Sequence, residues 1–274
     1  MPELPEIEVL RRSLEPYVLG DRIERVEVRD ARLREPIQTR ELARRVSGRR
    51  IDRLERRGKY LLLELEGGWS LGIHLGMSGR FTLVPEDEPM EPHEHVAFFL
   101  ASGRKLRLRD PRRFGLVFTY KTAERDDDPH FAHLGVEPLE PEFSGATLRA
   151  AAVGRRGPVK GFLMDGTVVV GAGNIYAAEA LFRAGIHPLR SVARISAKRW
   201  DRLAELLVEV LSQAVGEGGT TLNDFADGEG RSGYFQVSLS VYGREGEACD
   251  RCGRAIRRAV LSNRSTFFCP GCQR

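Results

Sequence analysis

The chain has 274 residues, 41% of them hydrophobic and 30% charged, which is enough for one large domain or two ordinary ones. It contains no apolar run of about 18 residues and no basic segment followed by an apolar one, so we expect neither a transmembrane helix nor a signal peptide. The net charge is +4, but from Cys249 onward six arginines oppose one aspartate. A basic tail on a near-neutral body favours a polyanionic partner such as nucleic acid, with a solubilising tail as the alternative.

The N-terminal stretch predicts an amphipathic helix over residues 5–18. Its apolar residues recur every three or four positions and form one stripe: Ile7, Leu10, Leu14 and Val18. Pro5 suits the first turn of a helix, where its missing N–H group costs nothing. Glu3 and Glu6 then lie near the positive end of the helix dipole.

Several short strands are predicted after this helix. Apolar runs bounded by turn residues predict strands within residues 25–30, 59–76, 95–110 and 114–120. The second run predicts a hairpin around Gly67–Gly68, and the third predicts a hairpin that turns at Ser102–Gly103. Short strands with such turns favour a β-sandwich or barrel over a parallel sheet.

The composition changes between residues 124 and 141, where acids and prolines dominate, so we expect a linker or an extended crossing there. Beyond it the pattern is helical, and short helices are predicted over residues 144–152 and 158–164. A third helix is predicted to have Asn174 as its cap and to stop at Gly185.

The longest predicted helix has Ser196 as its cap and ends at Gly216. Its buried face is expected to consist of Trp200, Leu203, Leu207, Val210 and Leu211. The glycine-rich segment from Gly218 to about Gln236 then predicts a mobile loop.

The four cysteines form two C-x2-C pairs in the tail, separated by sixteen residues: Cys249, Cys252, Cys269 and Cys272. Four thiolates at this spacing predict one structural zinc ion with no open coordination position. Two disulfides are the alternative, which a cytosolic chain disfavours. The residues between the pairs alternate like a β-hairpin that turns near Ser262–Asn263, with Arg264 at or just past its tip. A hairpin this small depends on metal for much of its folding free energy.

The opening residues could also supply chemistry. Methionine before proline is normally removed, so we expect Pro2 to become the terminal residue and to carry a secondary amine. A neutral amine can attack a sugar carbon and form a Schiff base. Glu3 could transfer protons to a sugar oxygen, and Glu6 is a second carboxylate one turn on. From these residues alone, a proline at a helix start beside solvated acids is the better-supported interpretation.

Segments along the whole chain nevertheless resemble the bacterial formamidopyrimidine-DNA glycosylase family, which excises oxidised purines. They occur in the family's order: PELPE (2–6), RRGKYLLLEL (56–65), HLGMSGR (74–80), DPRRFG (110–115), VVGAGNIYAAEALFRAGIHP (169–188), GGTTLNDF (218–225), VYGREGE (241–247) and the four-cysteine finger. Any one segment is weakly specific, whereas the combination is highly specific. One departure is Gly166, where the family pattern leads us to expect a polar amide side chain.

The resemblance implies an α+β fold in three parts: an N-terminal catalytic β-sandwich with its leading helix (1–135), a helical helix–two-turn–helix domain with a lesion-capping loop (136–240), and a zinc finger (241–274). In the family, DNA lies in the cleft between domains and the damaged nucleotide is flipped out of the duplex. The resemblance also implies one structural zinc ion and damaged double-stranded DNA as the partner. We expect a monomer without membrane association, located in the bacterial cytoplasm at the nucleoid.

By resemblance, Pro2 attacks C1′ and releases the base, and β- and δ-elimination then remove both phosphates. Glu3 assists opening of the sugar ring. Lys59 contacts the phosphate beside the lesion and assists elimination. Glu6 either assists a later proton transfer or holds the terminus.

Further residues match the family's contacts with DNA. Those that fill the space left by the extruded base are Met77, Arg112 and Phe114. Those that match contacts with the DNA backbone are Asn174, Arg264, His74 and Tyr242. The glycine-rich loop, with Thr220 and Thr221, matches the lid over the flipped purine, whose backbone amides read the base.

Two alternatives stay open at this point. The endonuclease VIII-like glycosylases for oxidised pyrimidines share Pro2, Glu3, a lysine and a zinc finger, but they usually have glycine where this chain has Leu4. The DPRRFG stretch and the long lid also favour the purine enzyme. A zinc-ribbon DNA-binding protein without activity would explain the tail, but it would leave Lys59 and the opening residues unexplained.

Overall fold

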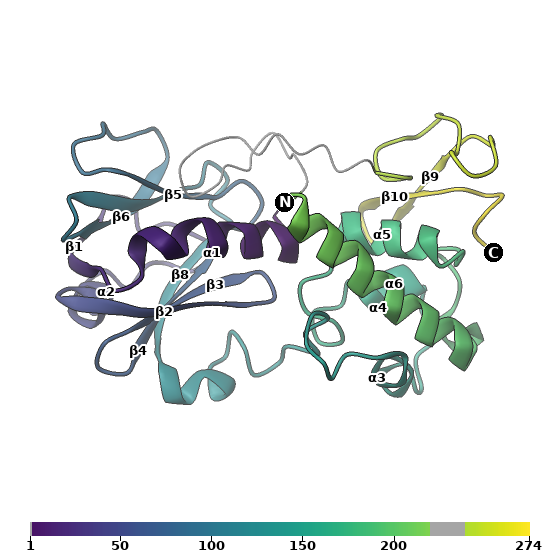
Figure 1. Cartoon of the computed structure of the whole chain (residues 1–274), viewed down its shortest axis with the longest axis horizontal. Helices are drawn as coiled ribbons and strands as arrows, with labels where there is room; N and C mark the ends of the chain where they lie inside the picture. Colours follow the sequence, from purple (N-terminus) through teal and green to yellow (C-terminus); the bar gives the residue numbers. More distant parts are fainter. Residues whose placement is uncertain (1, 220–238) are drawn as a thin grey trace. The chain divides into compact units, whose positions relative to one another are not determined.

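The computed structural model describes residues 2–219 and 239–274, which divide between two compact units (Figure 1). Of the described residues, unit 1 comprises 2–132, 218 and 219, and unit 2 comprises 133–217 and 239–274. Within the described ranges, no helix is long and apolar enough to cross a membrane.

Within the described part of unit 1, eight antiparallel strands pair in the order β5-β7-β6-β1-β2-β3-β4-β8. Their bounds are β1 (Arg22–Val28), β2 (Arg49–Arg57), β3 (Tyr60–Leu65), β4 (Trp69–His74), β5 (Arg80–Pro85), β6 (Glu94–Leu100), β7 (Arg104–Arg109) and β8 (Leu116–Lys121). The predicted hairpins are confirmed, because β3 and β4 flank Gly67–Gly68 and β6 and β7 flank Ser102–Gly103. Gly67, Gly68 and Gly103 all have positive φ, which the tight turns require.

The described part of unit 1 also contains two α-helices and a short 3-10 helix, η1 (Thr122–Asp127). Helix α1 (Leu4–Val18) contacts β2 and β3, and its predicted apolar stripe is buried in the core of the sandwich. Helix α2 (Thr39–Val46) contributes Leu42 and Val46 to the same core. The sequence pattern did not predict α2, β2 or β5.

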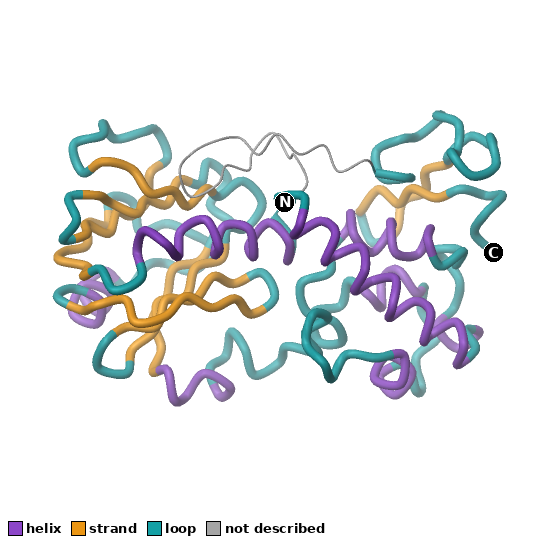
Figure 2. Tube along the Cα trace, in the orientation of Figure 1, coloured by secondary structure: helices purple, strands orange, loops and turns teal. Residues whose placement is uncertain are grey.

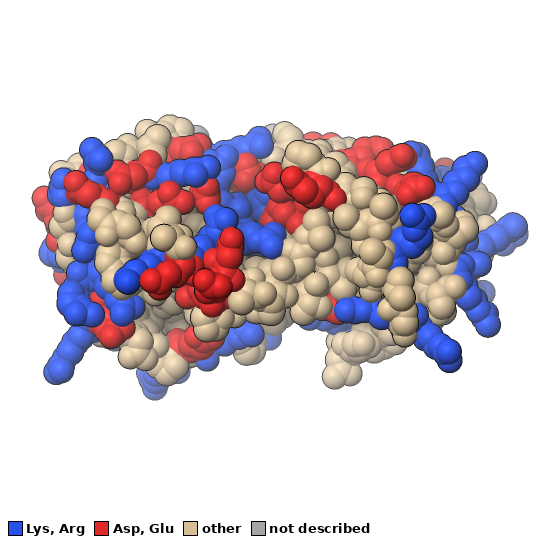
Figure 3. Space-filling view, turned by 90° about the horizontal axis from the view of Figure 1, so that it is seen from below, with Lys and Arg blue, Asp and Glu red and all other residues tan. Residues whose placement is uncertain are grey.

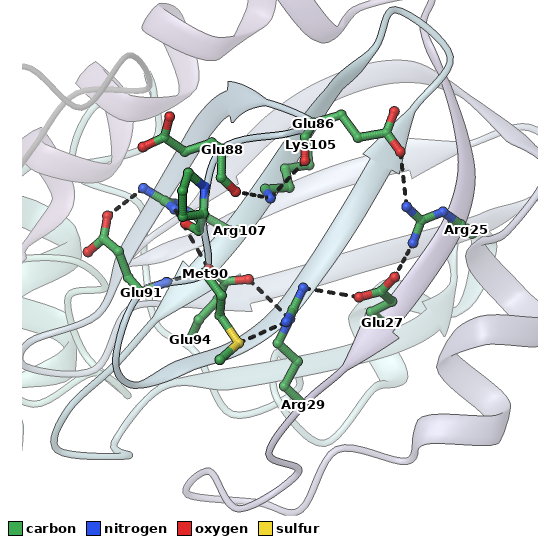
Figure 4. A network of polar contacts seen from close by, with 11 residues as sticks. Arg25, Glu27, Arg29, Glu86, Glu88, Met90, Glu91, Glu94, Lys105 and Arg107 are labelled. Atoms are coloured by element: carbon green, nitrogen blue, oxygen red, sulfur yellow. Dashed lines mark hydrogen bonds and ion pairs between the residues drawn. The ribbon is translucent and has the colours of Figure 1, made fainter.

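A partly buried polar network ties residues 86–92 to β7 (Figure 4). The ammonium of Lys105 is almost wholly buried and donates to the carbonyl oxygens of Glu86 and Glu88, at 2.9 and 2.6 Å. Arg107 donates to the carbonyl oxygen of Pro89 at 3.1 Å and pairs with Glu91. Segment 86–92 is therefore held by charged groups rather than by apolar packing.

Unit 2 is helical with a C-terminal hairpin (Figure 2). Its elements are α3 (Gly145–Ala151), α4 (Val159–Leu163), α5 (Asn174–Arg183), η2 (Val192–Arg194), α6 (Ala197–Gly216), β9 (Arg257–Leu261) and β10 (Arg264–Phe268). Helix α6 packs against α3 and α5, and α5 also contacts β10. The predicted buried face of α6 is confirmed for all five residues.

The predicted helix boundaries in unit 2 hold, with one correction. Ser144 caps α3 by accepting the Thr147 N–H, and Gly185 ends α5 with positive φ. The predicted cap Asn174 is wrong, because Gly173 occupies the N-cap position and Asn174 is the first helical residue. The physical reason is that the Asn174 side chain bonds to other segments, as described below.

Candidate functional site

The N-terminus is fixed by its own carboxylates. Pro2 is buried, and Glu3 and Glu6 are 1% and 0% exposed. Glu6 Oε2 accepts the backbone N–H of Glu3 at 2.8 Å, and Glu3 and Glu6 form a reciprocal capping box at the start of α1. The alternative of solvated acids is therefore wrong. The hydrogen bonds between Glu3 and Glu6 thus orient the residues at the start of the chain.

The turn that carries Lys59 is tied to the same helix. Lys59 lies between β2 and β3, next to Gly58, which has positive φ. Arg56 donates to the carbonyl oxygen of Gly58 at 3.2 Å and to Glu8 Oε2 of α1 at 3.3 Å. Burial raises the pKa of Glu8, but hydrogen bonds from Arg11 and Arg12 outweigh it and hold that pKa below its usual value. Glu8 thus stays ionised and couples α1 to the turn.

His74, at the end of β4, is a neutral imidazole. Its burial, together with the charges of Lys59 and Arg34, lowers its pKa to about 3. Its Nδ1 accepts the backbone N–H of Gly76 at 2.9 Å, so the ring proton lies on Nε2. His74 can therefore donate one hydrogen bond to an anion but supplies no positive charge at neutral pH.

Two loops of unit 1 are joined by the buried carboxylate of Asp110. Its Oδ1 accepts the hydroxyl of Ser78 at 2.7 Å and the N–H of Arg112 at 3.2 Å, and its Oδ2 accepts the N–H of Gly115 at 2.7 Å. A Cβ on Gly76 would meet the backbone of Phe114 at 2.4 Å, so only glycine allows this approach. The loop after β4 and the loop before β8 form one rigid platform.

This platform presents the three predicted wedge residues. Met77 and Phe114 are 38% and 44% exposed, which is unusual for large apolar side chains. The guanidinium of the exposed Arg112 lies 5.1 Å from the centroid of the Phe114 ring. Two apolar side chains and a planar cation are thus held together at the surface, a combination suited to stacking on bases.

In unit 2, Asn174 joins the start of α5 to the hairpin. Its Oδ1 accepts the buried ammonium of Lys160 at 2.6 Å, and its Nδ2 donates to the carbonyl oxygen of Ser265 at 3.1 Å. Lys160 also donates to Thr266 Oγ1 at 2.9 Å. The side chain of Asn174 is thus committed to protein groups.

The segment that carries Tyr242 is anchored by a second buried carboxylate. Glu179 of α5 accepts the consecutive N–H groups of Ser240, Val241 and Tyr242, at 2.8, 3.0 and 2.9 Å. The hydroxyl of Tyr242 accepts Asn174 Nδ2 at 3.4 Å. Arg264 is exposed at the first position of β10, directly after the turn at Ser262–Asn263, as the sequence predicts.

The four cysteines form a compact cluster in unit 2. Their Sγ atoms all lie within 4.8 Å of one another, with 3.9 Å between Cys249 and Cys272 and 3.4 Å between Cys252 and Cys269. Thiolates about 2.3 Å from a tetrahedral zinc ion lie about 3.8 Å apart, whereas a disulfide needs about 2.05 Å. The cluster therefore fits one zinc ion, and the alternative of two disulfides is wrong.

The site residues divide between the units, and sequence reasoning missed three that hold others in place. Asp110, Lys160 and Glu179 are buried polar groups that organise neighbouring loops. The available signal was a charged residue within an otherwise apolar stretch, as in VKGFL and AAEALF. Thr220 and Thr221 lie outside the described residues.

An antiparallel sandwich headed by a buried proline, with a helical unit that carries a four-cysteine hairpin, defines a class of protein: DNA glycosylases of the helix–two-turn–helix type. Family models agree. The formamidopyrimidine-DNA glycosylase N-terminal domain matches residues 1–117, its H2TH domain matches residues 134–226, and the zinc finger found in FPG and IleRS matches residues 246–274.

Whole-chain relatives identify the family. The chain is 50% identical over 274 residues to the formamidopyrimidine-DNA glycosylase of Syntrophotalea carbinolica, covering 100% of both chains. It matches the MutM (Fpg) structure from Thermus thermophilus with a TM-score of 0.88 and 42% identity, covering 99% of this chain and 98% of that one. A Lactococcus lactis Fpg complex with N7-benzyl-Fapy-dG DNA matches with a TM-score of 0.90 and 32% identity, over 99% of each chain. The chain belongs to the formamidopyrimidine-DNA glycosylase family.

Proposed function

We propose that this chain is a bifunctional DNA glycosylase and AP lyase that excises oxidised purines, 8-oxoguanine and formamidopyrimidines, from duplex DNA. The observation that carries the proposal is the fixed N-terminus, in which a buried Pro2 is followed by Glu3 and Glu6 in a capping box. A secondary amine at a chain end is a nucleophile that no internal residue can replace. The alternatives are an enzyme for oxidised pyrimidines and a DNA-binding protein without activity.

Chemistry begins when the Pro2 nitrogen attacks C1′ of the damaged nucleotide. The C1′–N bond to the base breaks, the base leaves with the bonding electrons, and a proton reaches it. Glu3 protonates the sugar ring oxygen, so the ring opens and an iminium forms between Pro2 and C1′. The iminium acidifies the C2′ proton, and its loss expels the 3′ phosphate. A second elimination expels the 5′ phosphate.

Other unit 1 residues support these steps. Glu6 accepts the N–H of Glu3, which favours the role of holding the terminus over that of a later proton donor. Lys59 neutralises the phosphate beside the lesion, and His74 adds a neutral donor through Nε2. Both lie at the ends of paired strands, because Tyr60, the neighbour of Lys59, is opposite His74 in the register of β3 and β4.

DNA is bound by both units in this proposal. Met77, Arg112 and Phe114 fill the space of the extruded nucleotide, and the orphaned partner base stacks on the planar cation. The start of α5 at Asn174 and the exposed Arg264 bind flanking phosphates, with Tyr242 as a further contact. Such contacts position the duplex without reading sequence, as an enzyme that works throughout a genome requires.

The zinc ion supplies structure rather than chemistry. Four cysteine ligands leave no position for water or substrate, so the metal fixes the hairpin that presents Arg264. The cluster is held to the segment after α5 by Gln273, which donates to the carbonyl oxygen of Ile186 at 2.9 Å and accepts the N–H of Cys269 at 2.8 Å. Loss of zinc should therefore impair DNA binding first.

The proposal includes the domain division 1–135, 136–240 and 241–274, supported by the order of the three family matches. It also includes a monomeric enzyme, since a single chain holds every proposed site residue. The enzyme is proposed to act at the nucleoid in the bacterial cytoplasm. Thr220 and Thr221 are assigned to the lid over the flipped base by resemblance alone.

Cleavage of matched duplexes tests the substrate. Duplexes with 8-oxoguanine opposite cytosine, thymine glycol opposite adenine, or no lesion are incubated with the protein, and the products are resolved on denaturing gels. The proposal expects preferential cleavage at 8-oxoguanine with phosphate left at both ends of the gap. Preferential cleavage at thymine glycol would indicate an enzyme for oxidised pyrimidines instead. Binding without cleavage would indicate a DNA-binding protein without activity.

A further inference from the structure

The sheet of unit 1 ends in an open strand. In the described part of the chain, β8 pairs with β4 and with no other strand. An antiparallel strand directs alternate backbone groups to its two sides, so half of those in β8 face away from β4. An unpaired edge of this kind is a template for another strand.

A groove runs along this open edge. Two adjoining cavities, of about 550 and 380 Å³, together touch all six residues of β8 and share Arg45 and Thr119 as lining residues. Residues 35–42 line one side and residues 124–130 the other, and His130, stacked on Phe118, contacts Glu35 across them at 3.2 Å. Leu116 and Val117 are buried, so the accessible part of the edge is residues 118–121, which at about 3.4 Å per residue accommodates an extended segment of about four residues. We call this feature the β8 edge groove.

The β8 edge groove is acidic, although the chain as a whole is basic. Its lining holds two cationic side chains, Arg45 and Lys121. Its five carboxylates are those of Glu35, Glu41, Glu124, Asp127 and Asp128. Figure 3 shows clusters of acidic side chains, interspersed with Lys and Arg, on the side of the molecule that faces down in Figure 1. Arg45 pairs with Glu41 and Lys121 with Glu124, so the lining keeps an excess of three carboxylates, which repels DNA phosphates and attracts cationic side chains.

The floor of the groove already holds one guanidinium. Arg45 lies 4.4 Å from the ring centroid of Trp69, donates to Thr119 Oγ1 at 3.2 Å and pairs with Glu41 at 3.0 Å. Its Nε is buried and has no hydrogen-bond partner among the described residues. A donor buried in this way is costly unless an acceptor arrives.

The opposite edge of the sheet is different. Strand β5 ends in Pro85, which has no N–H to offer. The cavity beside it is lined by four arginines, and Glu91 of segment 86–92 pairs with two of them, Arg109 and Arg107. The pair of Glu91 with Arg107 is seen in Figure 4. The combination of an open backbone, acidic walls and an unsatisfied donor therefore belongs to the β8 edge.

We propose that the β8 edge groove is a docking site for an extended, basic peptide segment of another protein, which adds to β8 as a further strand. Every second side chain of such a strand points to the same face, so alternate arginines or lysines would meet the carboxylates of the walls. None of the residues assigned to catalysis or DNA binding lines the groove. The enzyme could therefore be recruited by a partner while its DNA contacts remain available.

Three labelled octapeptides test both the charge and the strand pairing by fluorescence anisotropy. One alternates arginine and threonine, one alternates glutamate and threonine, and one alternates arginine and proline, which keeps the charge but removes half of the N–H donors. The proposal expects the arginine–threonine peptide to bind at least about ten-fold more tightly than either of the others. It also expects that peptide to slow hydrogen exchange in residues 118–121. Equal binding of the two cationic peptides would overturn strand addition.

A charge-reversed variant locates the binding. Glu35→Lys with Asp127→Lys reverses two walls of the groove, and Glu24→Lys with Asp87→Lys is the matched control at exposed positions of the same unit outside it. We expect about ten-fold weaker peptide binding for the first pair and less than about two-fold for the second, with lesion cleavage retained by both. Equal weakening by the two pairs would show attraction to net charge alone and would overturn the site.

Discussion

The buried neutral state of His74 predicts how unit 1 responds to acid. The pKa of this imidazole is lowered from 6.5 to about 3 by burial and by the charges of Lys59 and Arg34. Between these two pH values, the imidazole of His74 therefore binds a proton in the unfolded chain but not in the folded chain. Stability is full above about pH 6.5 and falls as the pH drops towards 3. Because of this group, the free energy of unfolding is about 2 kcal/mol lower at pH 5 than at pH 7.5.

The assay is urea unfolding of wild type and His74→Asn at pH 7.5 and pH 5.0. Asn Oδ1 can replace Nδ1 as the acceptor of the Gly76 N–H, but the amide does not titrate. The wild type should lose about 2 kcal/mol more than the variant between the two conditions. His93→Asn, at an exposed position of the same unit, is the matched control and should behave like wild type. If His74→Asn shows the same acid loss as wild type, the reasoning about its burial and charge is refuted.

Three further predictions concern the residues that hold the site together. Asp110→Asn should cost about 2 kcal/mol in urea unfolding, because three donors lose their anionic acceptor, whereas the exposed Asp87→Asn should stay within about 0.5 kcal/mol of wild type. An unchanged stability for Asp110→Asn would contradict the platform. Lys160→Met should weaken binding to a duplex with an abasic-site analogue by about ten-fold, because Asn174 and Thr266 lose a charged donor; undiminished affinity argues against this network. Chelation, or Cys272→Ser, should remove one zinc ion per chain and weaken duplex binding, and tight binding by the zinc-free protein would exclude the proposed role of the finger.

Much of the fold follows from local patterns. Helix α1 and the buried face of α6 could be predicted because their apolar residues repeat with helical spacing. The zinc site could be predicted because ligand spacing alone restricts the metal. Strand β2 could not, because its sequence, RRIDRLERR, is dominated by charges whose side chains lie outside the core. Its pairing with β3 decides its structure, and no local signal reports that pairing.

The site residues show the same division. A proline at the chain end and a lysine after RRG could be assigned by resemblance, but their fixation could not. Asp110, Lys160 and Glu179 read as ordinary charges in the sequence, yet each is buried where several donors or acceptors converge. Asparagine is a common helix N-cap, but the side chain of Asn174 is hydrogen-bonded to Lys160 and to the carbonyl oxygen of Ser265 instead. Residue spacing and helix or strand propensity do not predict hydrogen-bond partners that are this far apart in the sequence.

Covalent trapping tests the central claim, that Pro2 is the nucleophile, most directly. The protein is incubated with an 8-oxoguanine duplex in the presence of borohydride, which reduces a Schiff base to a stable amine, and the cross-linked peptide is identified by mass spectrometry. We expect DNA to be attached to the N-terminal peptide at the Pro2 nitrogen, and protein that retains Met1 to give no cross-link. Attachment at Lys59, or undiminished trapping by Pro2→Gly, would contradict it.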